Sequence, residues 1–269
     1  MIGKKTKKSS VFCLFFRLLF CYNKKGKHNG DCMIKIYGKN CINEALKNPV
    51  LSRVFVLDRL VKKEMARLKQ IDALKIPLEI ANQQKMDRLF GPSHQGWGAY
   101  RQDYDLYDES LIECLAGPYQ RLLLLDGITD PHNLGAIIRS VDAFGYDAII
   151  LPKNRSCSVT ETVAHVSTGA IEHVKIAYVN SLFAFVEQLK QKGYWICAAD
   201  AKGDVMLADV KKDCPLAVII GSEGFGISRT LLKAADYVVS IPMLGHVNSL
   251  NASVSAGIVL HALPKMLPE

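Results

Sequence analysis

From residue 121 onward, short apolar runs alternate with stretches in which apolar residues recur every three or four positions. The apolar runs lie at residues 122–125, 148–151, 175–179, 194–199, 216–220 and 237–241. Leu134, Ile138 and Val141, for example, fall on one face of a predicted helix. Helices are expected at residues 133–144, 161–174, 181–192, 228–235 and 251–263. Runs without polar residues are typical of strands buried on both faces, so the pattern predicts a parallel sheet covered by helices on both sides.

In a sheet of this kind, the ligand site lies outside the carboxyl ends of the strands. Two loops with glycines follow such ends, at residues 221–228 and 242–251. Both loops have little side-chain bulk and many main-chain donors and acceptors, which suits a flat, polar small molecule. The glycines lack the dinucleotide-binding spacing because Gly226 is followed by Ile-Ser-Arg, so a dehydrogenase is not expected.

Residues 33–100 show the same alternation on a smaller scale. Apolar segments at residues 53–57 and 76–80 predict strands, whereas residues 61–74 and 83–89 predict helices. We therefore predict a separate, small α/β domain in front of the larger one.

Two segments are expected to lie outside the domains. Residues 101–118 are acidic, rich in tyrosine and end in Gly-Pro, which predicts a linker with one short helix before a second domain of residues 119–269. Residues 1–32 combine lysines with an apolar run that is too short for a bilayer span and is interrupted by Arg17. We expect a leader outside the fold, with Met33 as the functional start. An interfacial membrane anchor is the alternative, but no stable membrane partner is expected.

The net charge of +8 is distributed unevenly. Residues 1–32 hold 8 basic and 1 acidic side chains, residues 33–100 hold 12 and 6, and residues 101–269 hold 14 and 19. If nucleic acid is the partner, the small domain is its expected electrostatic footprint. The 8 cysteines include no C-x-x-C pair and the histidines are scattered, so we expect no metal site and a cytoplasmic location.

Three segments carry a family resemblance. They are LDGITDPHNLGAIIR at residues 125–139, LAVIIGSEGFGIS at residues 216–228 and SIPMLGHVNSLNASVS at residues 240–255. In this order they resemble the three signature motifs of the SpoU–TrmH family of RNA ribose 2′-O-methyltransferases. The segment SHQGWGAY at residues 93–100 resembles the end of that family's small RNA-recognition domain, which is similar to ribosomal proteins that bind kinked RNA.

The resemblance implies a C-terminal domain with a deep trefoil knot, a homodimer formed through it, and S-adenosyl-L-methionine as cofactor. It also implies RNA as the substrate. The sequence most resembles the bacterial enzymes that methylate a guanosine of 23S ribosomal RNA, and a tRNA ribose methyltransferase is the alternative. A non-catalytic RNA-binding protein of the same fold is the rival from another functional class.

Arg139 is the first catalytic candidate. It lies off the apolar stripe of its helix, and members of the family carry an essential arginine at this position. Because arginine stays protonated, with a pKa above ~12, we expect its guanidinium to hold a phosphate and stabilise the developing alkoxide rather than act as a base. A surface ion pair is the alternative interpretation.

The resemblance implies further site residues. The catalytic candidates are Asn133, Glu223, Ser249 and Asn251; the cofactor-binding candidates are Gly221, Ile241, Met243, Gly245, Ser249 and Leu250; the RNA-binding candidates are Lys39, Lys62, Lys63, Arg67 and His94. Asn133 and Asn251 also stand where each would cap a helix. The alternatives are an exposed turn carboxylate for Glu223, a solvated helix face for the lysines, and a loop cap for His94.

Overall fold

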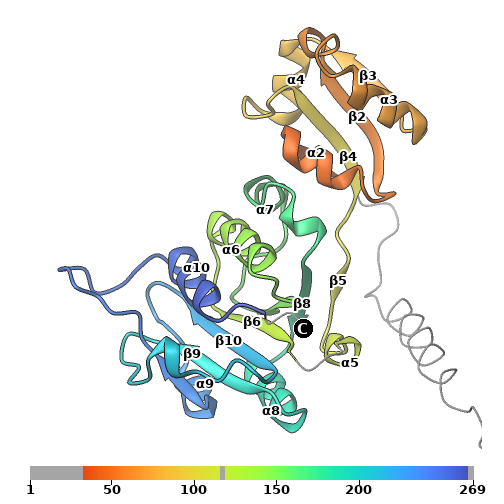
Figure 1. Ribbon diagram of the computed structural model, residues 1–269. Coiled ribbons are helices and arrows are strands. Elements are labelled where there is room, and N and C mark those ends of the chain that lie inside the picture. The colour runs from red at the N-terminus through yellow and green to blue at the C-terminus, as the bar shows by residue number, and fades with distance from the viewer. Residues whose placement is uncertain (1–32, 116–118, 266–269) are drawn as a thin grey trace, which may run out of the picture.

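The computed structural model describes residues 33–115 and 119–265, which form two α/β domains (Figure 1). The predicted leader, residues 1–32, and the Gly-Pro end of the predicted linker lie outside the described residues. Within the described ranges, no helix has the length and apolar character needed to cross a membrane.

The N-terminal domain contains a four-stranded sheet in the order β1-β4-β2-β3. Its elements are β1 (Met33–Tyr37), α2 (Lys39–Ala45), β2 (Leu51–Leu57), the 3-10 turn η1 (Asp58–Leu60), α3 (Met65–Ala73), β3 (Leu78–Ala81), α4 (Gln83–Phe90) and β4 (Trp97–Gln102). Strand β4 is antiparallel to β1 and β2, whereas β2 and β3 are parallel. The predicted α/β character is confirmed, but the helix expected at residues 61–74 begins only at Met65, because residues 61–63 continue the turn after β2.

The C-terminal domain contains a seven-stranded sheet in the order β11-β9-β10-β6-β7-β8-β5. Its strands are β5 (Leu106–Tyr107), β6 (Arg121–Asp126), β7 (Ala148–Pro152), β8 (Lys175–Val179), β9 (Trp195–Ala199), β10 (Leu216–Gly221) and β11 (Tyr237–Val239). Every neighbouring pair is parallel, as predicted. Strand β5 comes from the segment expected to be a linker, so part of residues 101–118 belongs to this sheet. The trefoil knot stays a prediction.

Helices cover both faces of this sheet, which confirms the layered arrangement (Figure 1). They are α5 (Leu111–Cys114), α6 (Pro131–Ala143), α7 (Glu161–Val166), the 3-10 turn η2 (Ala170–Glu172), α8 (Leu182–Gln191), the 3-10 turn η3 (Leu207–Asp209), α9 (Arg229–Ala234) and α10 (Ala252–Ala262).

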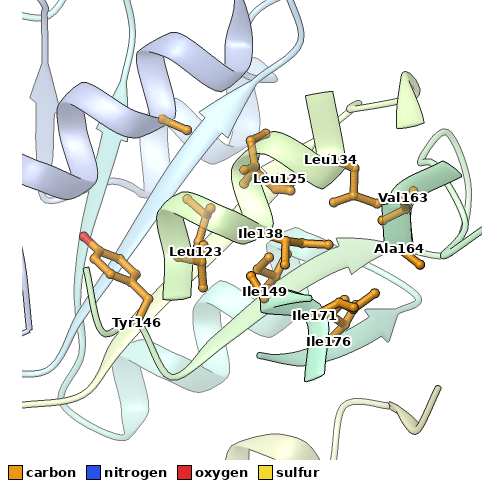
Figure 2. Close-up of a cluster of buried hydrophobic side chains, with 14 of the residues drawn as sticks. Leu123, Leu125, Leu134, Ile138, Tyr146, Ile149, Val163, Ala164, Ile171 and Ile176 are labelled. Carbon is orange, nitrogen blue, oxygen red and sulfur yellow. The ribbon is translucent and has the colours of Figure 1, made fainter. Parts of the chain in front are cut away.

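Strand β6 shows why the sheet is buried on both sides. Leu123 and Leu125 belong to the core that includes α6, α7 and α10, and Figure 2 shows them beside Leu134 and Ile138 of α6. Leu122 and Leu124 point to the opposite face and belong to the core that includes α8. Successive strand residues alternate between faces, so an all-apolar run is what a two-sided core requires.

The helix predicted at residues 161–174 begins at the expected residue but is too long. Helix α7 ends at Val166, and the chain then turns through Thr168 and Gly169, which have φ of 52° and 98°. The N-terminal domain occupies the space beside this turn, because a Cβ on Gly169 would lie 2.7 Å from Cγ of Glu44. Glycine is therefore favoured at position 169 both by its positive φ and by the packing of the small domain against it.

The two domains meet where α7 and η2 face the N-terminal sheet. The Arg101 guanidinium lies 3.1 Å from the Glu172 carboxylate, and each side chain is only 4% exposed. The rings of Tyr37 and His165 stack with their centroids 4.1 Å apart. These contacts fix one orientation of the small domain on the large one.

Candidate active site

Three loops meet at the carboxyl ends of strands β6, β10 and β11. The first follows β6 and leads into α6, the second follows β10, and the third precedes α10. Strands β6 and β10 are paired, with Asp126 opposite Gly221 at their ends. The strand order therefore places the three resembling segments at one edge of the sheet, where the sequence predicted the ligand site.

Asn133, Glu223 and Asn251 form a hydrogen-bonded cluster across these loops. Nδ2 of Asn133 donates to Oε1 of Glu223 at 3.0 Å. Nδ2 of Asn251 donates to the same oxygen at 2.5 Å and to Oδ1 of Asn133 at 2.9 Å. The main-chain N–H of Ala252 lies 3.3 Å from Oε1 of Glu223 as well. The structure thus brings together three of the predicted catalytic residues.

The helix caps decide which side chains are available to this cluster. Asp130, not Asn133, caps α6, because its carboxylate accepts hydrogen bonds from the main-chain N–H groups of His132 and Asn133. The Asn133 amide is therefore free to bind Glu223. Asn251 has both roles, since its Oδ1 accepts from the Ser253 N–H at 2.9 Å while its Nδ2 joins the cluster.

Two cavities flank the cluster. The larger has a volume of about 680 Å³ and lies against the loops after β6 and β10, and the smaller has a volume of about 230 Å³ and lies between the loop after β10 and the loop before α10. Both are lined by Ser222, Glu223, Gly226 and Ala252. These residues therefore form a shared wall, and two ligands bound on its two sides would both contact Glu223.

The smaller cavity contains most of the predicted cofactor-binding positions. Its lining includes Gly221, Ile241, Met243, Ser249 and Leu250. The lining combines aliphatic side chains with the main chain of two loops, which fits a molecule with a flat ring and polar groups. Gly245, another predicted position, is exposed and does not line this cavity.

Gly221 sets the path of the loop around this cavity. A Cβ on Gly221 would lie 2.2 Å from the carbonyl carbon of Gly226, a distance that no side chain tolerates. The loop folds back onto itself, with the Gly226 N–H donating to the Ser222 carbonyl at 2.9 Å. The main chain of Gly226 packs directly against Gly221, so any side chain at position 221 would clash with it.

Arg139 does not reach the cluster. It follows Asn133 by six residues on α6, which places it about 240° further around the helix. Its side chain is exposed, lines neither cavity and makes no hydrogen bond or ion pair with other residues in the described part of the chain. Ser249 lines the smaller cavity but does not bond to the cluster. The structure thus leaves two predicted catalytic residues apart from the other three.

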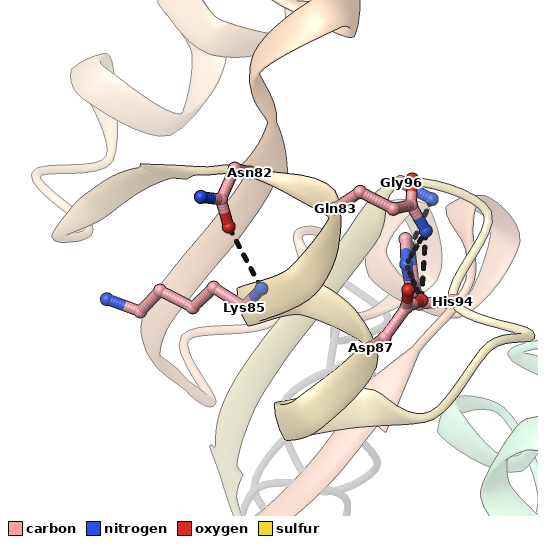
Figure 3. Close-up of polar contacts among 6 residues, drawn as sticks. All are labelled: Asn82, Gln83, Lys85, Asp87, His94 and Gly96. Carbon is pink, nitrogen blue, oxygen red and sulfur yellow. Dashed lines mark hydrogen bonds and ion pairs between the residues drawn. The ribbon is translucent and has the colours of Figure 1, made fainter.

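His94 has a structural position (Figure 3). Its ring is 2% exposed, its Nδ1 accepts the Gly96 N–H at 2.7 Å, and its Nε2 lies 3.1 Å from Oδ1 of Asp87. Gln83 lies 3.2 Å from the same ring nitrogen. An imidazole enclosed in this way is not accessible to RNA, so the loop-cap alternative replaces the expected RNA contact.

The other predicted RNA-binding residues fall into two groups. Lys39 and Arg67 both bind the Glu64 carboxylate, at 2.7 and 2.5 Å, and the Arg67 guanidinium also lies 5.0 Å from the centre of the Trp97 ring. Arg67 is therefore part of the domain's own packing. Lys62 and Lys63 are exposed in the turn before α3 and remain available to a ligand.

Five charged or aromatic residues that line the two cavities were not among the predicted site residues. Asp126 at the end of β6, Asp130 before α6 and Arg155 beyond β7 line the larger cavity. Phe225 lines it from the glycine-rich loop, and Asp200 lines the smaller cavity after β9. The signal was present for three of them, because Asp126, Arg155 and Asp200 stand at or beyond the carboxyl ends of predicted strands. Within the described residues, no group of three or more His, Cys, Asp or Glu side chains is placed to hold a metal ion.

Both domains are similar to known protein families. Residues 120–261 match the SpoU rRNA methylase family, and residues 35–104 match the RNA 2′-O ribose methyltransferase substrate-binding domain. A TrmH family tRNA/rRNA methyltransferase of Staphylococcus saprophyticus is 38% identical over 233 residues, which cover 85% of this chain and 94% of the relative.

Two solved structures share the fold over nearly the whole chain. The SpoU methyltransferase AviRb of Streptomyces viridochromogenes, in complex with AdoMet, has a TM-score of 0.72 at 22% identity and covers 95% of this chain and 97% of its own. An AdoMet-bound rRNA methyltransferase of Sinorhizobium meliloti has a TM-score of 0.71 at 20% identity, with 97% of each chain covered. At 22% and 20% identity, the likeness of these two structures supports the fold of both domains and their order along the chain.

Proposed function

The chain belongs to the SpoU rRNA methylase family and is an S-adenosylmethionine-dependent RNA methyltransferase, and we propose that it transfers the methyl group to a ribose 2′-hydroxyl of 23S ribosomal RNA. The observation that carries the proposal is the position of the Asn133–Glu223–Asn251 cluster in and beside the wall shared by two cavities. We assign the smaller cavity to the cofactor and the larger one to the RNA. When bound, the cofactor supplies an electrophilic methyl group on a sulfonium centre.

The cluster leaves one carboxylate oxygen of Glu223 free for the acceptor. The two asparagine amides and the Ala252 N–H all approach Oε1 of Glu223. No residue in the described part of the chain donates to Oε2, which is therefore free to accept a hydrogen bond from a ribose hydroxyl. Methyl transfer depends on holding that hydroxyl in line with the methyl group. In favourable systems such positioning lowers the activation free energy by about 7–11 kcal/mol.

We assign Arg139 to the RNA backbone. Its guanidinium is exposed and has no acidic partner among the described residues, so it is available to a phosphate of the RNA strand outside the two cavities. Arg139→Ala should lower the turnover by about 10²–10³-fold and leave the affinity for S-adenosylmethionine unchanged, as measured by methyl transfer and by calorimetry. Unchanged turnover would remove Arg139 from the mechanism.

The N-terminal domain is assigned to RNA recognition. It carries the basic excess of the described chain, and Lys62 and Lys63 are exposed on it. Replacing both lysines by glutamate should weaken RNA binding and leave cofactor binding intact, because phosphate contacts contribute most of a protein's salt-dependent RNA affinity. Equal weakening of both affinities would contradict separate roles for the two domains.

Transfer of tritiated methyl groups to total RNA tests the substrate. The RNA comes from a strain that lacks the gene, and the label is located after alkaline hydrolysis. Label in 23S ribosomal RNA, retained in one alkali-resistant dinucleotide, is the expected result. Label in tRNA would favour the alternative substrate, which the name of the staphylococcal relative also includes. Alkali-sensitive label would place the methyl group on a base and overturn the proposal.

A further inference from the structure

Phe225 is exposed at the rim of the larger cavity. Its side chain is 98% exposed, although phenylalanine is among the residue types most often buried. It follows Glu223 by two residues and lines the same cavity. Nothing in the described fold packs on this ring, so the ring does not stabilise the fold by being buried.

The loop that carries Phe225 is held in a defined turn. The Gly226 N–H donates to the Ser222 carbonyl at 2.9 Å, and the Phe225 N–H lies 3.4 Å from Oγ of the same serine. Gly226 has a φ of 65°, which favours glycine and closes the turn. The ring is therefore presented outward by a fixed main chain.

Arg155 lines the same cavity from another loop. It lies beyond β7, is exposed, and has no ion-pair partner among the described residues. Two carboxylates of the cavity are already bound by main-chain groups: Asp126 accepts the Ser228 N–H at 2.9 Å, and Asp130 caps α6. The cavity thus combines an exposed aromatic ring with an exposed, unpaired guanidinium.

We propose that the larger cavity holds an unpaired nucleotide of the RNA, with its base stacked on Phe225 and its phosphate bound by Arg155. An aromatic ring beside a cation is the combination with which proteins bind single-stranded nucleic acid. Stacking accepts any base, so Phe225 contributes affinity and positioning rather than sequence recognition. The inference rests on the proposed function, because it supplies the contacts that hold the ribose beside Glu223.

A substitution series at Phe225 tests the stacking. Phe225→Ala should lower kcat/KM for RNA about 5- to 150-fold, mainly through KM, with unchanged affinity for S-adenosylmethionine. Phe225→Trp should retain most of the activity, whereas Phe225→Leu, which keeps an apolar side chain without a ring face, should lose it. Because the ring is exposed, the melting temperature of all three variants should match that of the parent protein.

Arg155 has a matched control in the same loop. Lys153 is also exposed, but its Nζ binds Oδ1 of Asn180 at 2.9 Å and it does not line the larger cavity. The affinity for deproteinised ribosomal RNA, measured by filter binding, should be lower for Arg155→Ala than for the parent protein. The slope of log affinity against log salt should fall by about 0.7–0.9. Lys153→Ala removes the same charge and should change both quantities less.

Three results would overturn the inference. They are unchanged kinetics of Phe225→Ala, full activity of Phe225→Leu, and a molar mass of Phe225→Ala in solution below that of the parent protein. The last result would show that a second copy covers the ring. These failures are distinct from failure of the proposed function. If the parent protein methylated a base, ribose transfer would be wrong, while the effect of each substitution on RNA binding would still support or refute the nucleotide contacts.

Discussion

Two polar clusters in this protein are each centred on one glutamate but lie in opposite environments. The Asn133–Glu223–Asn251 cluster joins the first turn of α6 to two loops beside two cavities, and Glu223 and Asn251 are exposed. The Arg101–Glu172 ion pair lies at the domain junction, where each side chain is 4% exposed and the Tyr104 ring sits 3.5 Å from the guanidinium carbon. Burial raises the pKa of Glu172, although the Arg101 charge acts in the opposite direction.

The difference lies in what surrounds each carboxylate. The groups around Glu172 belong to the protein, and a buried charge there must keep its partner because water cannot replace it. Glu223 keeps one oxygen for a partner that the protein does not supply. We infer that the buried pair fixes how the domains are oriented, whereas the open cluster is arranged for a substrate.

Breaking the buried pair should give the largest effect. Arg101→Met leaves Glu172 as an uncompensated buried charge and should lower the free energy of unfolding by about 3–5 kcal/mol, measured by urea denaturation at neutral pH. The double variant Arg101→Met/Glu172→Met should recover most of this loss. If the double variant is no better than the single one, the ion pair is not the cause.

The pH dependence of the same variant has a defined sign. A carboxyl group whose folded-state pKa is raised contributes most stability below its unfolded pKa, and this contribution is lost as pH rises through the folded pKa. Removing Arg101 raises the pKa of Glu172 further. The deficit of Arg101→Met should therefore shrink as the pH is lowered and Glu172 is protonated; a deficit independent of pH would contradict this.

Glu223→Ala should have the next largest effect, this time on catalysis. It removes the acceptor of both asparagine amides and the oxygen assigned to the ribose, so kcat should fall by about 10²–10³-fold. The melting temperature should change little, because the side chain is exposed. A large loss of stability with normal turnover in the surviving protein would make Glu223 structural.

Gly221→Ala should affect the cofactor cavity. The added Cβ would clash with the main chain of Gly226, and shifting a packed segment costs about 1–3 kcal/mol. We expect this loss mainly in the affinity for S-adenosylmethionine. Gly224→Ala, three residues along the same loop, is the control, because its Cβ would meet nothing within 4 Å. Equal losses in both variants would point to loop flexibility rather than a steric clash.

The smallest expected effect is on a thiol at the junction. Burial raises the pKa of Cys41 to about 11, and its Sγ contacts the Ala164 carbonyl of the other domain at 3.6 Å. Iodoacetamide should therefore modify Cys41 more slowly than Cys214 at pH 8, as followed by peptide mass spectrometry, because the thiol is both protonated and covered. Arg101→Met should speed the modification of Cys41 if the domains separate more often.

The sequence predicted the parallel sheet and the region of the site, because the signals for both are local. Runs such as residues 216–220 report burial on two faces, and the rule for parallel sheets places ligands at the carboxyl ends. The same reasoning erred on the helix at residues 161–174. The local pattern of apolar residues carries no information about the position of Glu44, which packs where a side chain on Gly169 would have to lie.

The candidate site was predictable as a set of residues but not as an arrangement. The resemblance of three segments to the family's signature motifs implied that Asn133, Glu223 and Asn251 belong to one site. Only the tertiary structure decided that these residues, 90 and 118 positions apart, meet through one carboxylate oxygen, because their contact depends on strand β10 lying beside β6. The six-residue spacing of Asn133 and Arg139 already separates them around the helix. The tertiary structure decided which of the two faces the cluster, because the core on which α6 packs fixes the orientation of the helix.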